Sequence, residues 1–418
     1  MINEEIFSIF DFASGISEAI DLVSPVLNDH HKKVAYISYS IAKEMNLPNK
    51  EIRDIVLGAI LHDIGAFTCE ERFKVISVLF DDSEYNQHPI MGYKLLRNFE
   101  PFSEAATLIK YHHAHFDKSP ENIPLGSYVI HLADRLSIMF DSRREILIQV
   151  PEIMARIKKN KAIFHPATLA ALYQLSKMEY FWIESTLLPI NNVLPIRIPF
   201  PHILMELETL RSFAKVISQI IDFRSRFTAT HSSGVAAVAA ELTAISGFSQ
   251  KECQLMEIAG YLHDIGKLAV SNSILEKNGV LNTEESNEMR KHSYFTYVIL
   301  NRIKGFEQIA MWAACHHERL DGNGYPFHLK GNNFSKLARI LAVADIVTAI
   351  TEDRPYRAGM DSENAIEILL EMVENGGIDK GTVNLVKENF CRINDVRIKA
   401  QQEELADYTD FYSISNSS

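Results

Sequence analysis

The pentapeptide Leu-His-Asp-Ile-Gly occurs twice in this chain of 418 residues, with His62 in the first copy and His263 in the second. The copies lie 201 residues apart, and a further histidine precedes each copy at the same distance. His30 precedes His62 by 32 residues, and His231 likewise precedes His263 by 32 residues. Repetition of this kind is typical of a duplicated structural unit. We therefore expect two copies of one unit.

The match between the two halves continues after the pentapeptide. His88 lies 24 residues before His112, and His292 lies 24 residues before His316. A second histidine follows directly in each half, and an aspartate comes later in an apolar segment. These further pairs are His113 and His317, and Asp134 and Asp345. Ten of the sixteen histidines occupy repeated positions, which favours a shared chemical role over chance.

The apolar residues follow a helical period in both halves. In the segments 52–59 and 255–262 they recur with the i, i+3, i+4 spacing of one buried helix face. Alternating patterns typical of strands are scarce. The sequence therefore predicts an all-α protein made of two tandem helical domains.

Four prolines between the halves predict the connector, because proline lacks an amide donor and ends helices. They are Pro189, Pro195, Pro199 and Pro201. The expected organisation is an N-terminal domain over 1–188, a proline-rich linker over 189–203, a C-terminal domain over 204–400 and a flexible polar tail over 401–418.

Composition narrows the range of partners. The formal net charge is −12, and no long run of lysine and arginine occurs, so we expect no binding to duplex nucleic acid. No apolar run reaches the ~20 residues of a membrane helix, and we expect no membrane association. The four cysteines form no CxxC pair, which favours a reducing compartment and a cytoplasmic location. A small anionic ligand would need local cations or metal ions.

The repeated histidines and aspartates suit a dinuclear metal site. Adjacent helical residues point about 100° apart, so a His-Asp pair can grip one metal while its carboxylate bridges to a second. Neutral imidazole and carboxylate ligands suit Fe, Mn or Zn. The C-terminal candidates are His231, His263, Asp264, His292, His316, His317 and Asp345, and the N-terminal candidates are His30, His62, Asp63, His88, His112, His113 and Asp134.

Each candidate has a simpler interpretation as a hydrogen-bonded structural histidine or aspartate, which the paired His-Asp and His-His motifs make less attractive. In the N-terminal half, inherited ligands that no longer bind metal remain an alternative. We expect two divalent metals in the C-terminal domain and one or two in the N-terminal domain.

The C-terminal half resembles the HD-GYP subfamily of the HD hydrolase superfamily, which is defined by a His…His-Asp…Asp pattern. The resemblance rests on HDIGK at 263–267, HHERLDGNGYP at 316–326 and ADIVTAITEDRPYR at 344–357. It extends from about Leu204 to Cys391. It implies hydrolysis of cyclic dinucleotides, commonly cyclic di-GMP, at a centre that contains Fe or Mn.

The resemblance also implies roles for individual residues. Asp264 would bridge the metals, and Lys267 would contact phosphoryl oxygens or assist proton transfer. One metal would bind His231, His263, Asp264 and Asp345, and the other would bind Asp264, His292, His316 and His317. Arg354 and Arg357 would bind phosphate, while Gly324, Tyr325 and Pro326 would shape a surface that could also contact a signalling protein.

Simpler roles are open for the basic residues. Lys267 could be a solvated lysine at a helix end, and Arg354 and Arg357 could form local salt bridges.

Two positions depart from the subfamily pattern. Phe227 stands four residues before the first ligand, where some members have a glutamate that binds a third metal. Thr348 stands three residues after the last ligand, where members often have an aspartate. We therefore expect two metals rather than three, and the choice between cyclic di-GMP and 3′3′-cyclic GMP-AMP stays open.

The N-terminal half lacks both the lysine and the GYP loop. Ala66 replaces the lysine, and only 21 residues separate His113 from Asp134, against 28 from His317 to Asp345. The tandem arrangement resembles that of bacterial 3′3′-cyclic GMP-AMP phosphodiesterases. By that resemblance the C-terminal domain would open the ring to 5′-pApG, and the N-terminal domain would act as a 5′-nucleotidase on it. A scaffold without activity is the alternative for this half.

For the whole chain, the principal alternative is a non-catalytic module that senses a nucleotide or binds a protein partner. A general nucleotidase without a cyclic substrate is a third interpretation, which the complete GYP string disfavours. We favour a metal-dependent cyclic dinucleotide phosphodiesterase.

Overall fold

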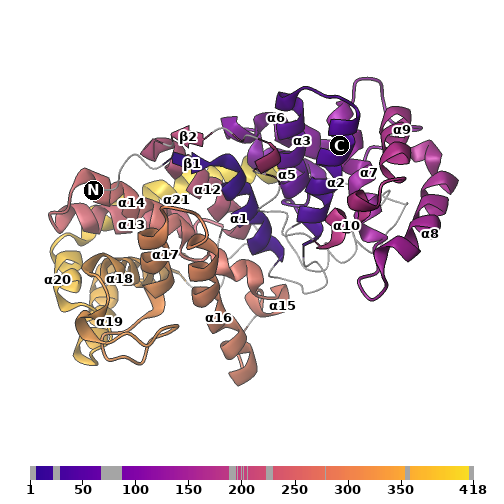
Figure 1. Cartoon of the computed structure of the whole chain (residues 1–418). Coiled ribbons are helices and arrows are strands. Elements are labelled where there is room, and N and C mark those ends of the chain that lie inside the picture. Colours follow the sequence, from indigo (N-terminus) through magenta and orange to yellow (C-terminus); the bar gives the residue numbers. More distant parts are fainter. Residues whose placement is uncertain are drawn as a thin grey trace. The chain divides into compact units, whose positions relative to one another are not determined.

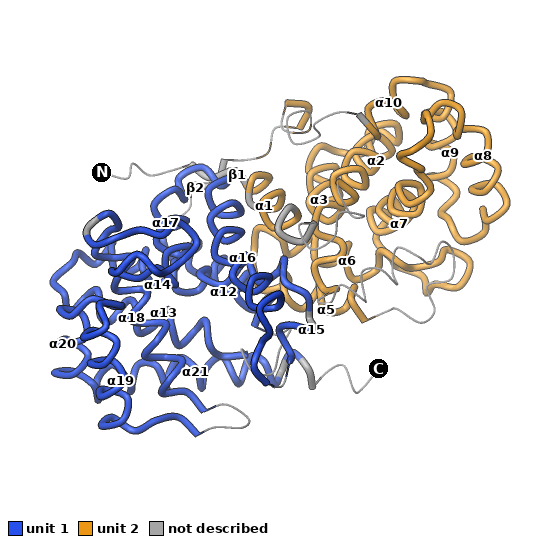
Figure 2. The backbone as a smooth tube through the Cα atoms, turned by 90° about the horizontal axis from the view of Figure 1, so that it is seen from below, with its two compact units in different colours: residues 1–7, 204–418 blue, residues 8–203 orange. Residues whose placement is uncertain are grey.

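The computed structural model forms two compact units (Figure 2). One unit comprises Ser8–Ile203, and the other comprises Leu204–Ser418 together with Met1–Phe7. The residues described are 6–21, 29–66, 87–187, 194, 196–198, 200, 202–204, 206–222, 229–277, 279–353 and 358–413. The four prolines of the expected linker, Phe227, Arg354 and Arg357 lie outside these ranges.

The described part of the N-terminal unit is mainly helical (Figure 1). Its α-helices are α1 (Ile9–Asp21), α2 (His30–Glu44), α3 (Asn49–Leu61), α5 (Gln87–Leu96), α6 (Ser103–Lys110), α7 (Leu125–Ile138), α8 (Ile146–Lys159), α9 (Pro166–Leu175) and α10 (Glu179–Leu187). Two 3₁₀ turns, η2 (Glu100–Phe102) and η3 (Lys161–Ile163), complete it. Helix α2 packs against α3, α7 and α9 and forms the centre of this unit.

The C-terminal unit repeats this plan. Its α-helices are α12 (Leu207–Asp222), α13 (His231–Ile245), α14 (Gln250–Leu262), α15 (Asn272–Leu275), α16 (Thr283–Leu300), α17 (Glu307–Ala314), α18 (Lys336–Thr351), α19 (Ser362–Glu374), α20 (Lys380–Glu388) and α21 (Phe390–Ser413). The 3₁₀ turns are η4 (Ile265–Ala269), η5 (Cys315–His317) and η6 (Gly331–Asn333). Helix α13 occupies the position of α2 and packs against α14, α18 and α21.

The prediction of an all-α fold is confirmed, apart from one short sheet. Strands β1 (Ile6–Ser8) and β2 (His202–Leu204) pair where the chain passes between the two units. The apolar faces expected before each His-Asp pair are buried, with Ile258 and Val56 fully inaccessible. No helix within the described ranges is long and apolar enough to cross a membrane.

Side-chain caps define where several helices of the C-terminal unit begin. Ser249 and Glu252 form a reciprocal capping box at the start of α14, and Asn282 and Glu285 do the same at α16. These bonds satisfy amide groups that a helix N-terminus otherwise leaves without acceptors. They fix the start of the helix that ends at the second His-Asp pair and of the helix that carries His292.

The glycine of each repeated pentapeptide permits close contact between two backbones. A Cβ atom on Gly266 would lie 1.9 Å from the carbonyl oxygen of His292, and one on Gly65 would lie 2.2 Å from that of His88. Only glycine fits such a separation. The helix that carries His88 or His292 can therefore pack directly against the turn that carries the His-Asp pair.

The expected flexible tail is wrong over most of its length, because α21 continues to Ser413. Polar contacts hold this part of the helix in place. Gln401 donates to Glu352 at 3.1 Å, and Glu404 is buried beside Gln219 and Lys215. Gln401 and Glu404 therefore have fixed partners elsewhere in the unit, while most of the other polar side chains of the segment are exposed.

Candidate metal centres

Each His-Asp pair lies at the C-terminal end of a helix. Helix α14 ends at Leu262, so that His263 is its C-cap and Asp264 begins the following turn. Helix α3 ends at Leu61, and His62 is likewise its C-cap. This end carries the negative pole of the helix dipole, which favours a bound cation. Because the chain turns there, both side chains of a pair can face one centre.

In the C-terminal unit, the seven expected ligands lie together around Asp264, and all of them are buried except His317, whose side chain is 33% exposed. The Oδ1 atom of Asp264 lies 3.4 Å from His292 Nε2 and 3.8 Å from His316 Nε2, while Oδ2 lies 3.2 Å from His263 Nε2. Asp345 Oδ1 lies 3.2 Å from His231 Nε2. Asp264 thus has one oxygen toward each of two histidine groups, the arrangement that a bridging carboxylate needs.

Backbone carbonyls orient three of these imidazoles. The Nδ1–H groups of His263, His292 and His316 donate to the carbonyls three residues earlier, at 2.6–2.7 Å. These bonds direct each Nε2 atom toward the cluster, and in the neutral form of each ring this atom carries no proton. A metal-binding histidine commonly has this arrangement, with its second nitrogen held by a backbone acceptor.

His231 is oriented by a carboxylate that the sequence patterns did not reveal. Its Nδ1 atom lies 3.1 Å from Glu352 Oε2, and Glu352 is only 4% exposed. Glu352 in turn accepts a hydrogen bond from Gln401 of α21. The two residues are 121 positions apart, so no local spacing could have connected them.

Asp222 is a second residue near the site that sequence reasoning missed. It is the last residue of α12, and it accepts hydrogen bonds from the backbone N–H and the hydroxyl of Ser232. Ser232 follows His231 at the start of α13. Burial raises the pKa of Asp222 to about 7, against the lowering effect of His231. Its contacts tie the first turn of α13, and with it His231, to α12.

Lys267 contacts Asp264, as expected for a residue at this centre. Its Nζ donates to Asp264 Oδ2, and its side chain is 18% exposed. Burial lowers the pKa of Lys267, but Asp264 outweighs this effect and the net shift is upward. A charged ammonium group beside the Asp264 carboxylate is well placed to meet an anionic ligand.

Burial and charge prepare the cluster for metal binding. Burial lowers the pKa of His292 to about 3, and burial together with His317 and His263 lowers that of His316 well below its usual value. Burial would raise the pKa of Asp264, but His263 and Lys267 hold it well below its ordinary range. Two neutral imidazoles and an ionised carboxylate are the forms that bind a divalent cation.

Unsatisfied ligand atoms support the same conclusion. Within the described part of the chain, Asp264 Oδ1 is buried and accepts no hydrogen bond, and the same holds for Asp63 Oδ1. Leaving a buried carboxylate oxygen without a partner is costly. The mixed imidazole and carboxylate donors fit divalent Fe, Mn or Zn. A metal ion bound in each cluster would satisfy the carboxylate oxygen of that cluster.

The GYP loop packs beside this cluster. The ring centres of Tyr325 and His317 lie 4.9 Å apart. The guanidinium carbon of Arg290 lies over the Tyr325 ring, 5.3 Å from its centre. A Cβ atom on Gly324 would lie 2.3 Å from the amide nitrogen of Arg319, so the loop requires glycine there. Glu318 holds the loop by accepting from the amides of Phe327 and Leu329.

Pro326 follows Tyr325 in the GYP loop through a cis peptide bond.

Thr348, which replaces the aspartate of the subfamily pattern, is buried, and its hydroxyl donates to the carbonyl of Ala344. A Cβ atom on Gly234 would lie 2.9 Å from its methyl group. Thr348 therefore packs between α18 and α13. Arg354, Arg357 and Phe227 lie outside the described residues, so the roles expected for them stay predictions.

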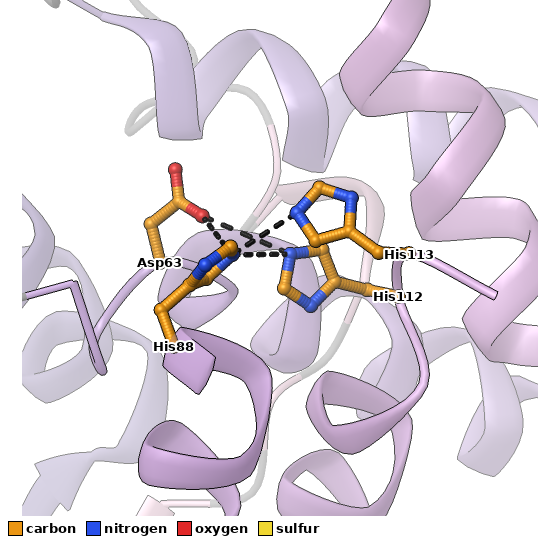
Figure 3. Close-up of side chains that lie close together, drawn as sticks. All are labelled: Asp63, His88, His112 and His113. Carbon is orange, nitrogen blue, oxygen red and sulfur yellow. Dashed lines mark hydrogen bonds and ion pairs between the residues drawn. The ribbon is translucent and has the colours of Figure 1, made fainter. Parts of the chain in front are cut away.

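The N-terminal unit brings its own seven candidates together. Asp63, His88, His112 and His113 have ligand atoms within 4.8 Å of one another, and so do His30, His62 and Asp134. Figure 3 shows Asp63 and the three imidazoles of the first group pointing toward a common centre. The Nδ1–H groups of His62 and His112 donate to backbone carbonyls at 2.7–2.8 Å, as in the C-terminal unit.

The two units differ in the cations near the cluster. Ala66 occupies the position of Lys267 and is fully buried. Arg135, directly after Asp134, is also fully buried, and its Nη2 atom lies 2.8 Å from Asp134 Oδ2. The N-terminal cluster therefore has a guanidinium group, at another position, instead of the ammonium group.

Sequence comparisons identify two domains of one family. The HD domain family profile matches residues 28–139, and a second HD domain profile matches residues 215–381. The first range contains every N-terminal candidate ligand, and the second contains every C-terminal one.

Similar curated proteins include two from Vibrio cholerae serotype O1. The 3′3′-cGAMP-specific phosphodiesterase 1 is 27% identical over 413 residues, covering 94% of each chain. The 3′3′-cGAMP-specific phosphodiesterase 3 is 26% identical, covering 94% of this chain and 98% of the relative. The cyclic di-GMP phosphodiesterase response regulator RpfG of Xanthomonas campestris is 36% identical, over 39% of this chain and 43% of its own length.

A solved structure shares the fold. The crystal structure of the cyclic GMP-AMP-specific phosphodiesterase V-cGAP3 of V. cholerae aligns with a TM-score of 0.62 and 23% identity, covering 96% of this chain and 98% of that one. None of these comparisons supports a signalling protein as a partner of the GYP surface. The chain belongs to the HD superfamily of metal-dependent phosphohydrolases, with two HD domains in tandem and a C-terminal domain of the HD-GYP type.

Proposed function

We propose that the C-terminal domain hydrolyses a cyclic dinucleotide, 3′3′-cyclic GMP-AMP or cyclic di-GMP, to a linear dinucleotide. The observation that carries the proposal is the placement of Asp264. One of its oxygens faces each of two histidine groups, and Lys267 donates to its Oδ2 atom. The names of the similar proteins from V. cholerae and X. campestris support this substrate class.

The residues of the cluster divide the work of phosphodiester cleavage. Two bound metal ions, Fe or Mn, would supply Lewis acidity and an activated water. Asp264 would hold the two ions at a fixed separation. The ammonium group of Lys267 would stabilise negative charge on the phosphoryl oxygens, and Tyr325 would limit the space beside His317 in which the substrate binds.

For the N-terminal domain we propose removal of the 5′-phosphate from the linear product, 5′-pApG. Its histidine and aspartate groups are complete and buried. It has no counterpart of Lys267 or of the GYP loop, the two features that we assign to cyclic dinucleotide hydrolysis. Retention of all seven candidate ligands favours phosphate chemistry over a scaffold.

The test is the initial rate of ring opening by Mn- or Fe-loaded protein on each cyclic dinucleotide. We expect Lys267→Ala to lower kcat by about 10²-fold, the typical effect of losing one charge-stabilising group, while metal content stays unchanged. Lys304→Ala, an exposed lysine, serves as the matched control. If the wild-type chain opens neither ring with either metal, the proposal fails and a non-catalytic nucleotide-binding module takes its place.

A further inference from the structure

The two clusters differ beside their last aspartate. In the N-terminal unit Arg135 follows Asp134, and in the C-terminal unit Ile346 follows Asp345. Nη2 of Arg135 lies 2.8 Å from Asp134 Oδ2 and 3.0 Å from His113 Nδ1. A guanidinium group therefore lies between an aspartate and a histidine that are both expected metal ligands.

The C-terminal unit shows the same two atoms without an arginine. There, His317 Nδ1 and Asp345 Oδ2 lie 4.0 Å apart. Exposure differs in parallel, because the side chain of Asp345 is 11% exposed and that of Asp134 only 1%. Arg135 thus fills one side of the N-terminal cluster at the position where the C-terminal cluster is more open.

This contact changes what His113 can offer to a metal. Arginine has only donors, so Nδ1 of His113 must accept, and the proton of the neutral ring lies on Nε2. That Nε2 atom is the one directed into the cluster, 3.0 Å from His88 Nε2. His62 and His112 have the opposite arrangement, because each donates from Nδ1 to a backbone carbonyl. His113 is therefore the one of these three rings whose inner nitrogen has no lone pair for a cation.

Charge acts in the same direction. The guanidinium group of an arginine side chain is a cation. A second divalent ion bound between Asp63, His88 and His112 would lie close to it in a buried environment, where like charges repel strongly. Arg135 also occupies one oxygen of Asp134.

The opposite end of the cluster gains a donor. His31 is 1% exposed, and its ligand atom lies within 4.8 Å of those of His62 and Asp63. The corresponding residue in the C-terminal unit is Ser232, whose hydroxyl donates to Asp222. Donors are therefore more numerous at the His30 end and fewer at the His113 end than in the C-terminal cluster.

We propose that the N-terminal domain binds one divalent metal ion tightly at its His30 end, and that Arg135 makes the second position weak, whereas the C-terminal domain binds two ions tightly. The inference rests on the proposed function only in that both clusters bind metal. It makes the two halves of the duplication different kinds of metal site.

The experiment counts Mn²⁺ ions per chain after gel filtration, in full-length variants in which one cluster is disabled. Asp264→Ala leaves the N-terminal cluster to be measured, and Asp63→Ala leaves the C-terminal one. We expect about one ion in the Asp264→Ala chain and about two in the Asp63→Ala chain. In the Asp264→Ala background, Arg135→Met should raise the content to about two, while Arg135→Lys, which keeps the charge, should leave it at about one.

A second comparison does not depend on the folding of an Arg135 variant. His113→Ala in the Asp264→Ala background should leave the metal content unchanged, whereas His317→Ala in the Asp63→Ala background should remove about one ion. Equal losses from the two histidine variants, or two tightly bound ions in the Asp264→Ala chain, would overturn the proposal. An Asp63→Ala chain that binds no Mn²⁺ would instead contradict the proposed function of the C-terminal domain.

Discussion

At the scale of single residues, the orientation of each candidate histidine ligand depends on the group that contacts its Nδ1 atom. Backbone carbonyls orient His263, His292 and His316, whereas His231 is the first residue of α13. Glu352 provides the acceptor instead, from the end of α18. Carboxylate–histidine–metal arrangements of this kind strengthen the ligand and fix its orientation.

Glu352→Gln should therefore weaken metal binding in the C-terminal domain. We expect the affinity to fall by about 10- to 100-fold, the usual effect of losing a group that orients a ligand. The measurement is Mn²⁺ titration of the Asp63→Ala chain with and without the substitution. Glu363→Gln, at an exposed position in α19, is the matched control. Equal affinities in the Glu352 and Glu363 variants would show that His231 needs no such partner.

The candidate ligands could be recognised in the sequence because a duplication repeats each of them, and the 32- and 24-residue spacings between histidines are the same in both halves. Glu352, Asp222 and Arg135 could not be predicted in this way. Glu352 and Asp222 act on α13 from other helices, and Arg135 has no counterpart in the second half. Their contacts depend on tertiary packing, which residue spacing does not encode.

At the scale of elements, the fold brings the ligands together by packing a short turn tightly against a helix. The amide of Gly266 donates to the hydroxyl of Thr296, which donates in turn to the carbonyl of His263. This network joins α16 to the end of α14. The helix that carries His292 is thereby held against the turn that carries Asp264.

Gly266→Ala should disturb this contact. Its Cβ atom would meet the carbonyl oxygen of His292 at 1.9 Å, and the backbones would have to move apart. We expect a loss of about 1–3 kcal/mol in the free energy of unfolding, as for other overpacked positions. Thermal denaturation followed by circular dichroism measures the loss.

Gly381→Ala is the control for this substitution. Gly381 lies in α20, and the nearest atoms to its Cβ position are on the side chains of Asp379 and Lys336, at 3.2 and 3.4 Å. Alanine should be neutral or slightly stabilising there. A Gly266 variant as stable as the Gly381 variant would contradict the role given to the pentapeptide glycine.

The sequence predicted the buried faces of helices better than it predicted where helices end. The apolar period revealed the buried faces before each His-Asp pair, and the structure buries them. The continuation of α21 to Ser413 was not predictable from composition, because its polar residues are held by partners such as Lys215 and Glu352, far away in the sequence.

At the scale of the whole molecule, the chain is a duplication. Each half has its own cluster of histidines and aspartates, and the residues around the two clusters differ. The second half has Lys267 and the GYP loop, and the first half has Ala66 and Arg135. Both halves keep a complete set of candidate ligands. Two successive reactions, ring opening and then removal of the 5′-phosphate from the linear product, would explain why the candidate ligands persisted while their surroundings changed.

The most direct test of this account is a product time course from 3′3′-cyclic GMP-AMP with wild-type, Asp63→Ala and Asp264→Ala protein. The wild-type chain should form 5′-pApG and then release its phosphate. Asp63→Ala should stop at 5′-pApG, and Asp264→Ala should leave the ring intact but still remove phosphate from added 5′-pApG. Ring opening by Asp264→Ala, or phosphate release by Asp63→Ala at the wild-type rate, would contradict the division of labour between the two domains.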